Sequence, residues 1–126
     1  MSVVHDASSL LALAFKEPGS DMVRPALRGS FISSVNWSEV VQKVQAKGRD
    51  SRQLRGLFEG LGVTVEPFRA GTAERAASLH PVTRDLGLSL GDRACLALGL
   101  EKGLTVYTAD RAWSTADLGV VVQPIR

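Results

Sequence analysis

The stretch SVVHDASSLLALAF, residues 2–15, decides the fold. Its first four residues predict a short β-strand, and the Leu- and Ala-rich segment after Asp6 predicts a helix over residues 7–15. Pro18-Gly19 then ends that helix. A strand followed at once by a helix is typical of the first unit of an α/β protein.

The rest of the chain continues this alternation. Further strands are expected at residues 31–33, 63–65, 104–107 and 120–122. Helices are expected at residues 21–27, 35–47, 51–61, 72–80 and 91–102, with a short helix or turn at 112–117. Pro25 weakens the helix at 21–27, and Pro81 kinks the chain after residue 80 or starts a new turn. We therefore predict an α/β fold in which a parallel sheet has helices on both faces.

Composition fits one globular domain that spans residues 1–126. Hydrophobic residues make up 44% of the chain and charged residues 22%, which are ordinary globular values. A net charge of +2 and a pI of about 9.0 permit a polyanionic partner without requiring one. No apolar run approaches the roughly 20 residues that a membrane span needs, so no membrane association is expected.

The single cysteine, Cys95, excludes an internal disulfide and fits a reducing cytoplasm. It lies in the apolar run at residues 94–98, which predicts a place in the core. No basic segment precedes an apolar stretch at the start of the sequence, so no signal peptide is expected.

Three aspartates fall at equivalent places in the predicted fold. Asp6 and Asp110 each follow a strand and precede a helical segment, and Asp92 lies in the first turn of the helix at residues 91–102. In a parallel α/β sheet these positions face one side of the molecule, where ligands bind close to the reversal of strand order. The three carboxylates are therefore expected to converge.

Each acid also has a purely structural interpretation. Asp6 and Asp110 are good helix N-caps, and Asp92 follows Ser89 at the spacing of a capping box. Glu39 lies roughly opposite the apolar stripe of the helix at residues 35–47, so taken alone it is expected on a solvated face. It gains interest only if that face borders the crevice where the aspartates meet.

Carboxylates gathered in this way need neutralising. Two of them about 4 Å apart repel by roughly 4 kcal/mol at an effective dielectric of 20, so one takes up a proton or a cation binds. Helix N-termini favour the ionised forms, which indicates a cation. His5 and His80 do not form a zinc-like spacing, and oxygen ligands suit Mg²⁺, or Mn²⁺. Such ions commonly serve phosphate chemistry.

Four blocks carry a resemblance to a known family. They are VVHDASSLLAL around Asp6, VNWSEV around Glu39, LSLGDRACLALG around Asp92 and VYTADRAW around Asp110. In this order they resemble the PIN-domain nucleases, and most closely the VapC toxins of bacterial toxin–antitoxin pairs, over almost the whole chain. The resemblance implies an α/β/α sandwich around a parallel sheet and Mg²⁺-dependent endoribonuclease activity on RNA.

The resemblance also assigns roles to residues. It implies that Asp6, Glu39, Asp92 and Asp110 form the family's acidic quartet. Asp6 and Asp92 would be direct metal ligands, and Asp110 a ligand directly or through water. Glu39 would hold a second ion or activate water. The family further implies a cognate antitoxin whose tail packs beside the acids, and a homodimer.

Other polar residues are candidates for substrate contacts. Ser8 and Asn36 match positions near the family's site. The hydroxyls of Ser8, Thr108 and Ser114 are placed to position water or phosphate, although each also suits a helix start or the surface.

Basic and aromatic residues give further candidates. Arg93 and Arg111, each beside an acid, are expected to contact phosphate, whereas Arg49, Arg52 and Arg55 better fit a solvated helix face than an RNA track. Trp113 fits base stacking and core packing equally well. His5 departs from the apolar residue usual in the family, and we expect a buried, hydrogen-bonded imidazole there.

Two alternative functions stay open. Asp6-Ala7-Ser8 after the first strand, together with Gly91-Asp92, faintly suggests an aspartyl-phosphate phosphatase, which would need a second acid two residues after Asp6 and a well-placed lysine near Asp110. A non-catalytic binding module, in which the acids serve only as helix caps, is the other alternative.

Overall fold

Five parallel strands form one central sheet in the computed structural model, which describes residues 2–126. The strands are β1 (Val3–His5), β2 (Ser30–Ser33), β3 (Val63–Glu66), β4 (Thr105–Thr108) and β5 (Val122–Pro124). Their order in the sheet is β3-β2-β1-β4-β5. The predicted parallel sheet is confirmed, and β1 is its central strand.

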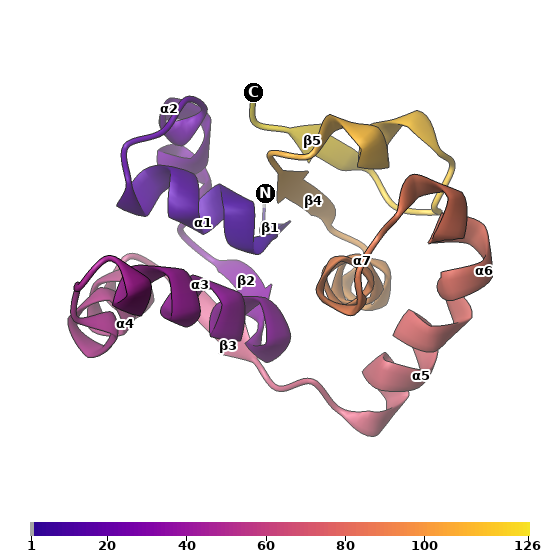
Figure 1. Ribbon diagram of the computed structural model, residues 1–126, viewed down its shortest axis with the longest axis horizontal. Coiled ribbons are helices and arrows are strands. Elements are labelled where there is room, and N and C mark those ends of the chain that lie inside the picture. Colours follow the sequence, from indigo (N-terminus) through magenta and orange to yellow (C-terminus); the bar gives the residue numbers. More distant parts are fainter. Residues whose placement is uncertain (1) are drawn as a thin grey trace.

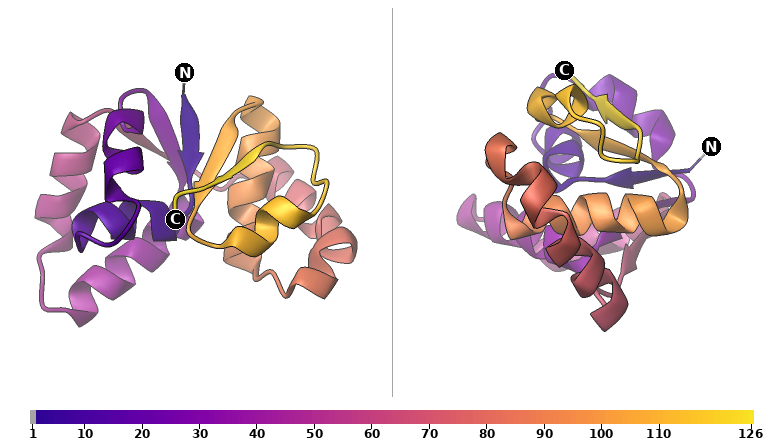
Figure 2. Two further views of the ribbon diagram at one scale, coloured as in Figure 1. Left: turned by 90° about the horizontal axis from the view of Figure 1, so that it is seen from above. Right: turned by 90° about the vertical axis from the view of Figure 1, so that its right-hand side faces the viewer.

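Helices cover both faces of this sheet, as Figures 1 and 2 show. One layer contains α1 (Ala7–Ala14), α2 (Ser20–Val23), α3 (Ser34–Ala46) and α4 (Ser51–Gly60). The opposite layer contains α5 (Ala70–Ser78), α6 (His80–Thr83) and α7 (Leu90–Lys102). Short 3-10 helices lie at Arg24–Ala26, Arg84–Leu86 and Arg111–Thr115. The fold is therefore the expected α/β/α sandwich.

Three predicted elements differ from the structure. The helix expected at 72–80 begins two residues earlier, as α5, and a separate helix, α6, begins at His80. The helix expected at 21–27 is divided into α2 and a 3-10 turn, because Pro25 has no N–H to continue an α-helix. The last strand begins two residues later than expected, at Val122. Pairing with β4 starts at the carbonyl of Val121, which accepts from Val106 N at 2.8 Å, and it extends to Pro124, which an edge strand tolerates.

A separate hydrophobic core fills each side of the sheet. Leu10, Ile32, Val40 and Phe58 belong to the core under α1, α3 and α4. Val4, Leu96, Val106 and Trp113 belong to the core under α5 and α7, and this cluster includes the predicted core residue Cys95. Trp113 is only 1% exposed, so base stacking is wrong for it and core packing is confirmed.

His5 is fully buried on β1, as expected. Its Nδ1 lies 2.8 Å from Ser9 Oγ, and its ring meets Tyr107 edge to face. Burial lowers the pKa of His5 to about 4, offset only in part by the main chain of Ala26, so the imidazole is neutral at neutral pH. None of the helices in residues 2–126 has both the length and the apolar character that crossing a membrane requires.

Helix α7 packs closely on the sheet because Gly99 has no side chain. A Cβ built at Gly99 would lie 2.5 Å from Val106 Cγ2 and 3.2 Å from Val120 Cγ2. Gly56, in the middle of α4, has no atom within 4 Å of the equivalent position. The two helical glycines thus form a matched pair, one in the core and one on the surface.

We predict opposite effects of alanine at these two glycines. Gly99→Ala should lower the free energy of unfolding by about 1–3 kcal/mol, because the added methyl overpacks the contact between α7 and β4. Gly56→Ala should raise it by up to about 1 kcal/mol, because alanine favours the helix and meets nothing. Urea unfolding of both variants checks this, and equal effects would contradict the close packing of α7.

Candidate active site

The two central strands bring distant acidic segments together. His5 pairs with Tyr107 in the β1–β4 register, and Asp6 N donates to Tyr107 O at 2.9 Å. Strand order reverses between β1 and β4, since β2 and β3 extend the sheet one way and β5 the other. Asp6 and the segment after Thr108 therefore lie at the carboxyl ends of the strands, where parallel α/β proteins bind ligands.

Asp6 is buried, at 7% exposure, and does not act as a helix cap. Its Oδ2 accepts hydrogen bonds from Ser8 Oγ at 2.7 Å and Thr108 Oγ1 at 3.0 Å, and its side chain makes no cap hydrogen bond. The capping interpretation is therefore wrong for Asp6. The Ser8 and Thr108 hydroxyls hold the buried Asp6 carboxylate in a position that does not stabilise the start of α1.

Charges near Asp6 add to the effect of its burial. Burial, together with the negative charges of Asp92 and Glu39, raises the pKa of Asp6 to about 6, and the hydrogen bonds from Ser8 and Thr108 oppose this rise. The same three carboxylates, after burial itself, raise the pKa of Cys95 in α7. Asp6, Asp92 and Glu39, three members of the predicted quartet, therefore lie near enough to one another to raise the pKa of the same thiol.

The two hydroxyls also fix the loop after β4 against α1. Ser8 Oγ accepts from Ala109 N at 2.9 Å, and Thr108 Oγ1 accepts from Asp110 N at 3.1 Å. Asp110 is therefore joined to Asp6 through the Thr108 hydroxyl. The predicted site residues Ser8 and Thr108 are brought together with Asp6, whereas Ser114 only donates to Arg111 O within its own 3-10 helix.

A second link joins α3 to the start of α7. Asn36 is fully buried, and its Nδ2 donates to Gly91 O at 2.9 Å and to Glu39 Oε1 at 3.0 Å. A Cβ at Gly91 would lie 2.5 Å from Glu39 Oε1, so this carboxylate lies directly over the first turn of α7. Glu39 is half-buried there, and the solvated-face interpretation is wrong for it.

Asp92 and Asp110 do act as helix caps. Asp92 Oδ2 accepts from Ser89 N at 2.9 Å while Ser89 Oγ accepts from Asp92 N at 3.1 Å, so the predicted capping box is confirmed. Asp110 Oδ1 accepts from Ala112 N at 3.0 Å. With these side chains in their capping positions, no three His, Cys, Asp or Glu side chains of residues 2–126 form a ready metal-binding group.

The donor atoms around Asp6 nevertheless fit a hard divalent cation. They include carboxylate oxygens of Asp6, Asp92 and Glu39. Glu39 accepts a hydrogen bond from the buried side chain of Asn36, and the Oδ1 atom of Asn36 itself has no hydrogen-bond partner. An unpartnered buried amide oxygen is costly, and oxygen-only sets suit Mg²⁺ or Mn²⁺. A cation there would also relieve the repulsion among the carboxylates.

The two candidate arginines make contacts of their own. Arg93 Nη1 donates to Ala76 O at 3.0 Å, which directs the guanidinium to α5 rather than to the acids. Arg111 Nε donates to Arg126 O at 2.7 Å. The structure thus does not bring these side chains to Asp6, and a phosphate contact by either one would require its present hydrogen bond to open.

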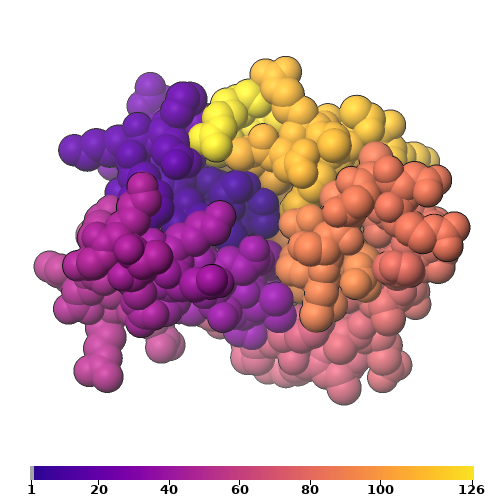
Figure 3. Space-filling model, viewed as in Figure 1, coloured from indigo at the N-terminus to yellow at the C-terminus, as the bar shows by residue number. Residues whose placement is uncertain are grey.

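Sequence reasoning named Gly91 only in the phosphatase alternative and did not predict its contacts with Glu39 and Asn36. The available signal was a glycine directly before an aspartate in the first turn of a predicted helix, where helix propensity disfavours glycine. Its cause, the Glu39 carboxylate, is far away in the sequence. Figure 3 shows the N-terminal segment, α3 and the start of α7 meeting in the middle of one face of the molecule.

The chain is an α/β protein with acidic residues gathered at the carboxyl ends of its central strands, and a family model identifies the family to which it belongs. The PIN domain model matches residues 3–118, so the chain belongs to the PIN domain family. A search of curated proteins by sequence gave no match.

Solved structures share the fold at low sequence identity. A toxin–antitoxin complex from Klebsiella pneumoniae is 18% identical, with a TM-score of 0.79 over 99% of this chain and 98% of that one. FitAcB from Neisseria gonorrhoeae is 19% identical, with a TM-score of 0.71 over 98% and 97% of the two chains. VapBC2 from Rickettsia felis, bound to a fragment of promoter DNA, is 13% identical, with a TM-score of 0.71 over 98% of each chain.

We predict that Asp6→Asn stabilises the fold when no divalent ion is present. The amide keeps the size of the side chain but removes a charge that is buried beside Asp92 and Glu39. The free energy of unfolding at pH 8 in EDTA should rise by about 1–3 kcal/mol, given a pKa raised from 3.8 to about 6. Urea unfolding measures it, with the exposed Asp21→Asn as a control that should change stability by less than about 0.5 kcal/mol. A clear loss of stability in Asp6→Asn would show that the carboxylate is structural.

Proposed function

We propose that this protein is a Mg²⁺-dependent endoribonuclease and the toxin of a toxin–antitoxin pair. The observation that supports this most is Asp6, a buried carboxylate that caps nothing, held by Ser8 and Thr108 beside the charges of Asp92 and Glu39. It lies where parallel α/β sheets bind ligands. Membership of the PIN domain family, whose members are generally nucleases that use divalent ions, agrees with this assignment.

Asp6, Asp92 and Asp110 are the residues we assign to the cation, with Mn²⁺ as the alternative ion. When bound, the ion would supply charge stabilisation at the phosphate and make a water molecule more acidic. Ser8 and Thr108 both donate to Asp6 Oδ2, which fixes the carboxylate and leaves Oδ1 as the oxygen that we assign to the ion. Asp92 and Asp110 would turn from their capping bonds toward Asp6.

Glu39 is the group we assign to the attacking water. Asn36 holds its Oε1 at 3.0 Å and anchors the pair on the Gly91 carbonyl, so the carboxylate keeps one orientation over α7. A carboxylate that is held but only half-buried can accept a proton from water. Asn36 thus acts as a positioning residue for Glu39.

RNA is the proposed substrate, and an antitoxin is the proposed partner. The net charge of +2 suits a polyanionic substrate, and Arg93 and Arg111 stay candidates for phosphate contacts once their present bonds open. The structures named above include a toxin–antitoxin complex and VapBC2, and on that likeness we propose a cognate antitoxin for this chain. A homodimer and action in the cytoplasm belong to the same proposal.

The alternative functions have less support. A phosphatase that forms an aspartyl phosphate on Asp6 would need an acid at position 8, where Ser8 instead donates a hydrogen bond to Asp6 Oδ2. A binding module in which every acid is a cap does not account for Asp6, whose side chain caps nothing.

A pair of variants at one capping box tests the function. Asp92→Asn keeps an oxygen that accepts from Ser89 N, so the fold should survive, but RNA cleavage in Mg²⁺ should fall at least about 100-fold through loss of a charged ligand. Ser89→Ala breaks the same box and should cost about 1 kcal/mol of stability while leaving cleavage nearly unchanged. Gel analysis of a structured RNA with Mg²⁺ and with EDTA, together with urea unfolding, measures both.

Two results would contradict the proposed function. One is a wild-type protein that cuts no RNA, or that cuts equally well in EDTA. The other is an Asp92→Asn protein that is unfolded while Ser89→Ala is equally inactive, because Asp92 would then matter only as a cap.

A further inference from the structure

A groove between α1 and α3 leads away from the acids. We call it the α1–α3 groove; it has a volume of about 350 Å³ and is lined by Ser8, Leu11, Phe15, Glu17, Lys43, Ala46, Lys47 and Arg126. Ser8 connects the groove to the active site, because its hydroxyl donates to Asp6 Oδ2 at 2.7 Å. A molecule lying in this groove therefore has one end at the proposed reaction centre.

The groove carries an excess of positive charge. Lys43 lies in the last turn of α3, Lys47 is the C-cap residue that follows this helix, and both side chains are exposed and line the groove. The only carboxylate in the lining, Glu17, is already paired, with its Oε1 3.4 Å from Arg126 Nη1. Within residues 2–126 neither lysine takes part in an ion pair, so both ammonium groups are available to an anion.

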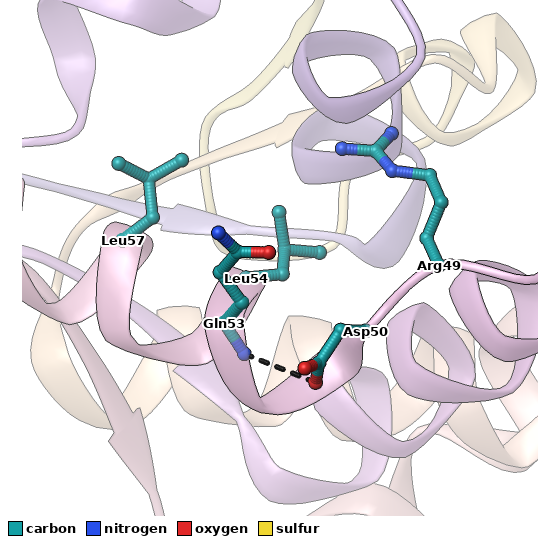
Figure 4. Close-up of a pocket in the computed structure, with 5 residues that line it drawn as sticks. All are labelled: Arg49, Asp50, Gln53, Leu54 and Leu57. Carbon is teal, nitrogen blue, oxygen red and sulfur yellow. Dashed lines mark hydrogen bonds between the residues drawn. The ribbon is translucent and has the colours of Figure 1, made fainter.

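Cationic side chains continue past the far end of the groove. Lys47 Nζ lies 4.6 Å from the centre of the Phe15 ring, and Arg49 Cζ lies 5.6 Å from it. Arg49 Nη1 donates to Ala14 O at 2.6 Å, which fixes the guanidinium beside the end of α1. Arg49 also lines a neighbouring hollow of about 450 Å³ with Asp50, Gln53, Leu54 and Leu57, where its side chain extends away from the Asp50 carboxylate (Figure 4).

We propose that a single strand of RNA lies in the α1–α3 groove, with its backbone phosphates on Lys43 and Lys47 and the bond to be cut at the acids. This inference rests on the proposed function, which it extends by giving the substrate a path. Successive positive groups along one side of a hollow match the regular negative charge of a nucleic-acid backbone. The positive charge of the groove does not favour a basic peptide.

The test compares two double variants that remove equal charge. Lys43→Ala/Lys47→Ala alters the groove, while Arg52→Ala/Arg75→Ala removes two exposed arginines from α4 and α5. Fluorescence anisotropy with a labelled 12-nucleotide single-stranded RNA in EDTA measures binding without cleavage. The groove variant should bind at least tenfold more weakly, and its slope of log K against log salt should be smaller by about 1.4, for two lost phosphate contacts.

The controls separate the two proposals. The Arg52→Ala/Arg75→Ala protein should stay within twofold of wild type, and thermal unfolding should show that both variants fold. A wild type that cuts RNA, with a groove variant that binds like the control, overturns the groove proposal and leaves the nuclease assignment intact. A wild type that cuts no RNA in Mg²⁺ overturns the nuclease assignment. Lysine-dependent binding of a labelled oligoglutamate peptide, with RNA binding unaffected, would assign the groove to an acidic protein segment instead.

Discussion

The parallel pairing of β1 with β4 is the constraint on which the candidate site depends. The register that places His5 opposite Tyr107 also places Asp6 beside Thr108, a hundred residues away along the chain. One hydroxyl then joins the two strand ends, because Thr108 Oγ1 donates to Asp6 and accepts from Asp110 N. A shift of one residue in this register would turn Thr108 away from Asp6 and separate the acids.

The acids of the proposed site differ in what they contribute to stability. Asp92 and Asp110 each accept main-chain hydrogen bonds at the start of a helix, which favours folding. Asp6 occupies the N-cap position of α1, but its side chain makes no capping hydrogen bond. It lies buried near the negative charges of Asp92 and Glu39. A protein retains such an arrangement when function requires it, because binding sites are commonly places where stability is sacrificed.

Local sequence patterns predicted most of the fold but only part of the site. Apolar segments, glycine stops and proline breaks placed the strands and helices, and the resemblance to PIN domains is confirmed by the family match. The contacts that went unpredicted join residues far apart in the chain. Glu39 lies over Gly91 and Arg93 reaches Ala76 because α3, α5 and α7 pack together, and no local pattern contains that packing. The last strand was misplaced because Val121, though apolar, is 67% exposed, and hydrophobicity alone does not fix pairing.

The central claim is that carboxylates from distant segments share one divalent ion, and diffraction from crystals grown with Mn²⁺ tests it most directly. Anomalous scattering should show a peak bounded by Asp6, Asp92 and Asp110, with the Asp92 side chain turned away from Ser89 N, and Asp6→Asn crystals should lack it. An empty site in wild-type crystals soaked to saturation would contradict the account. So would an ion found only at other surfaces, with Asp92 and Asp110 still in their capping positions.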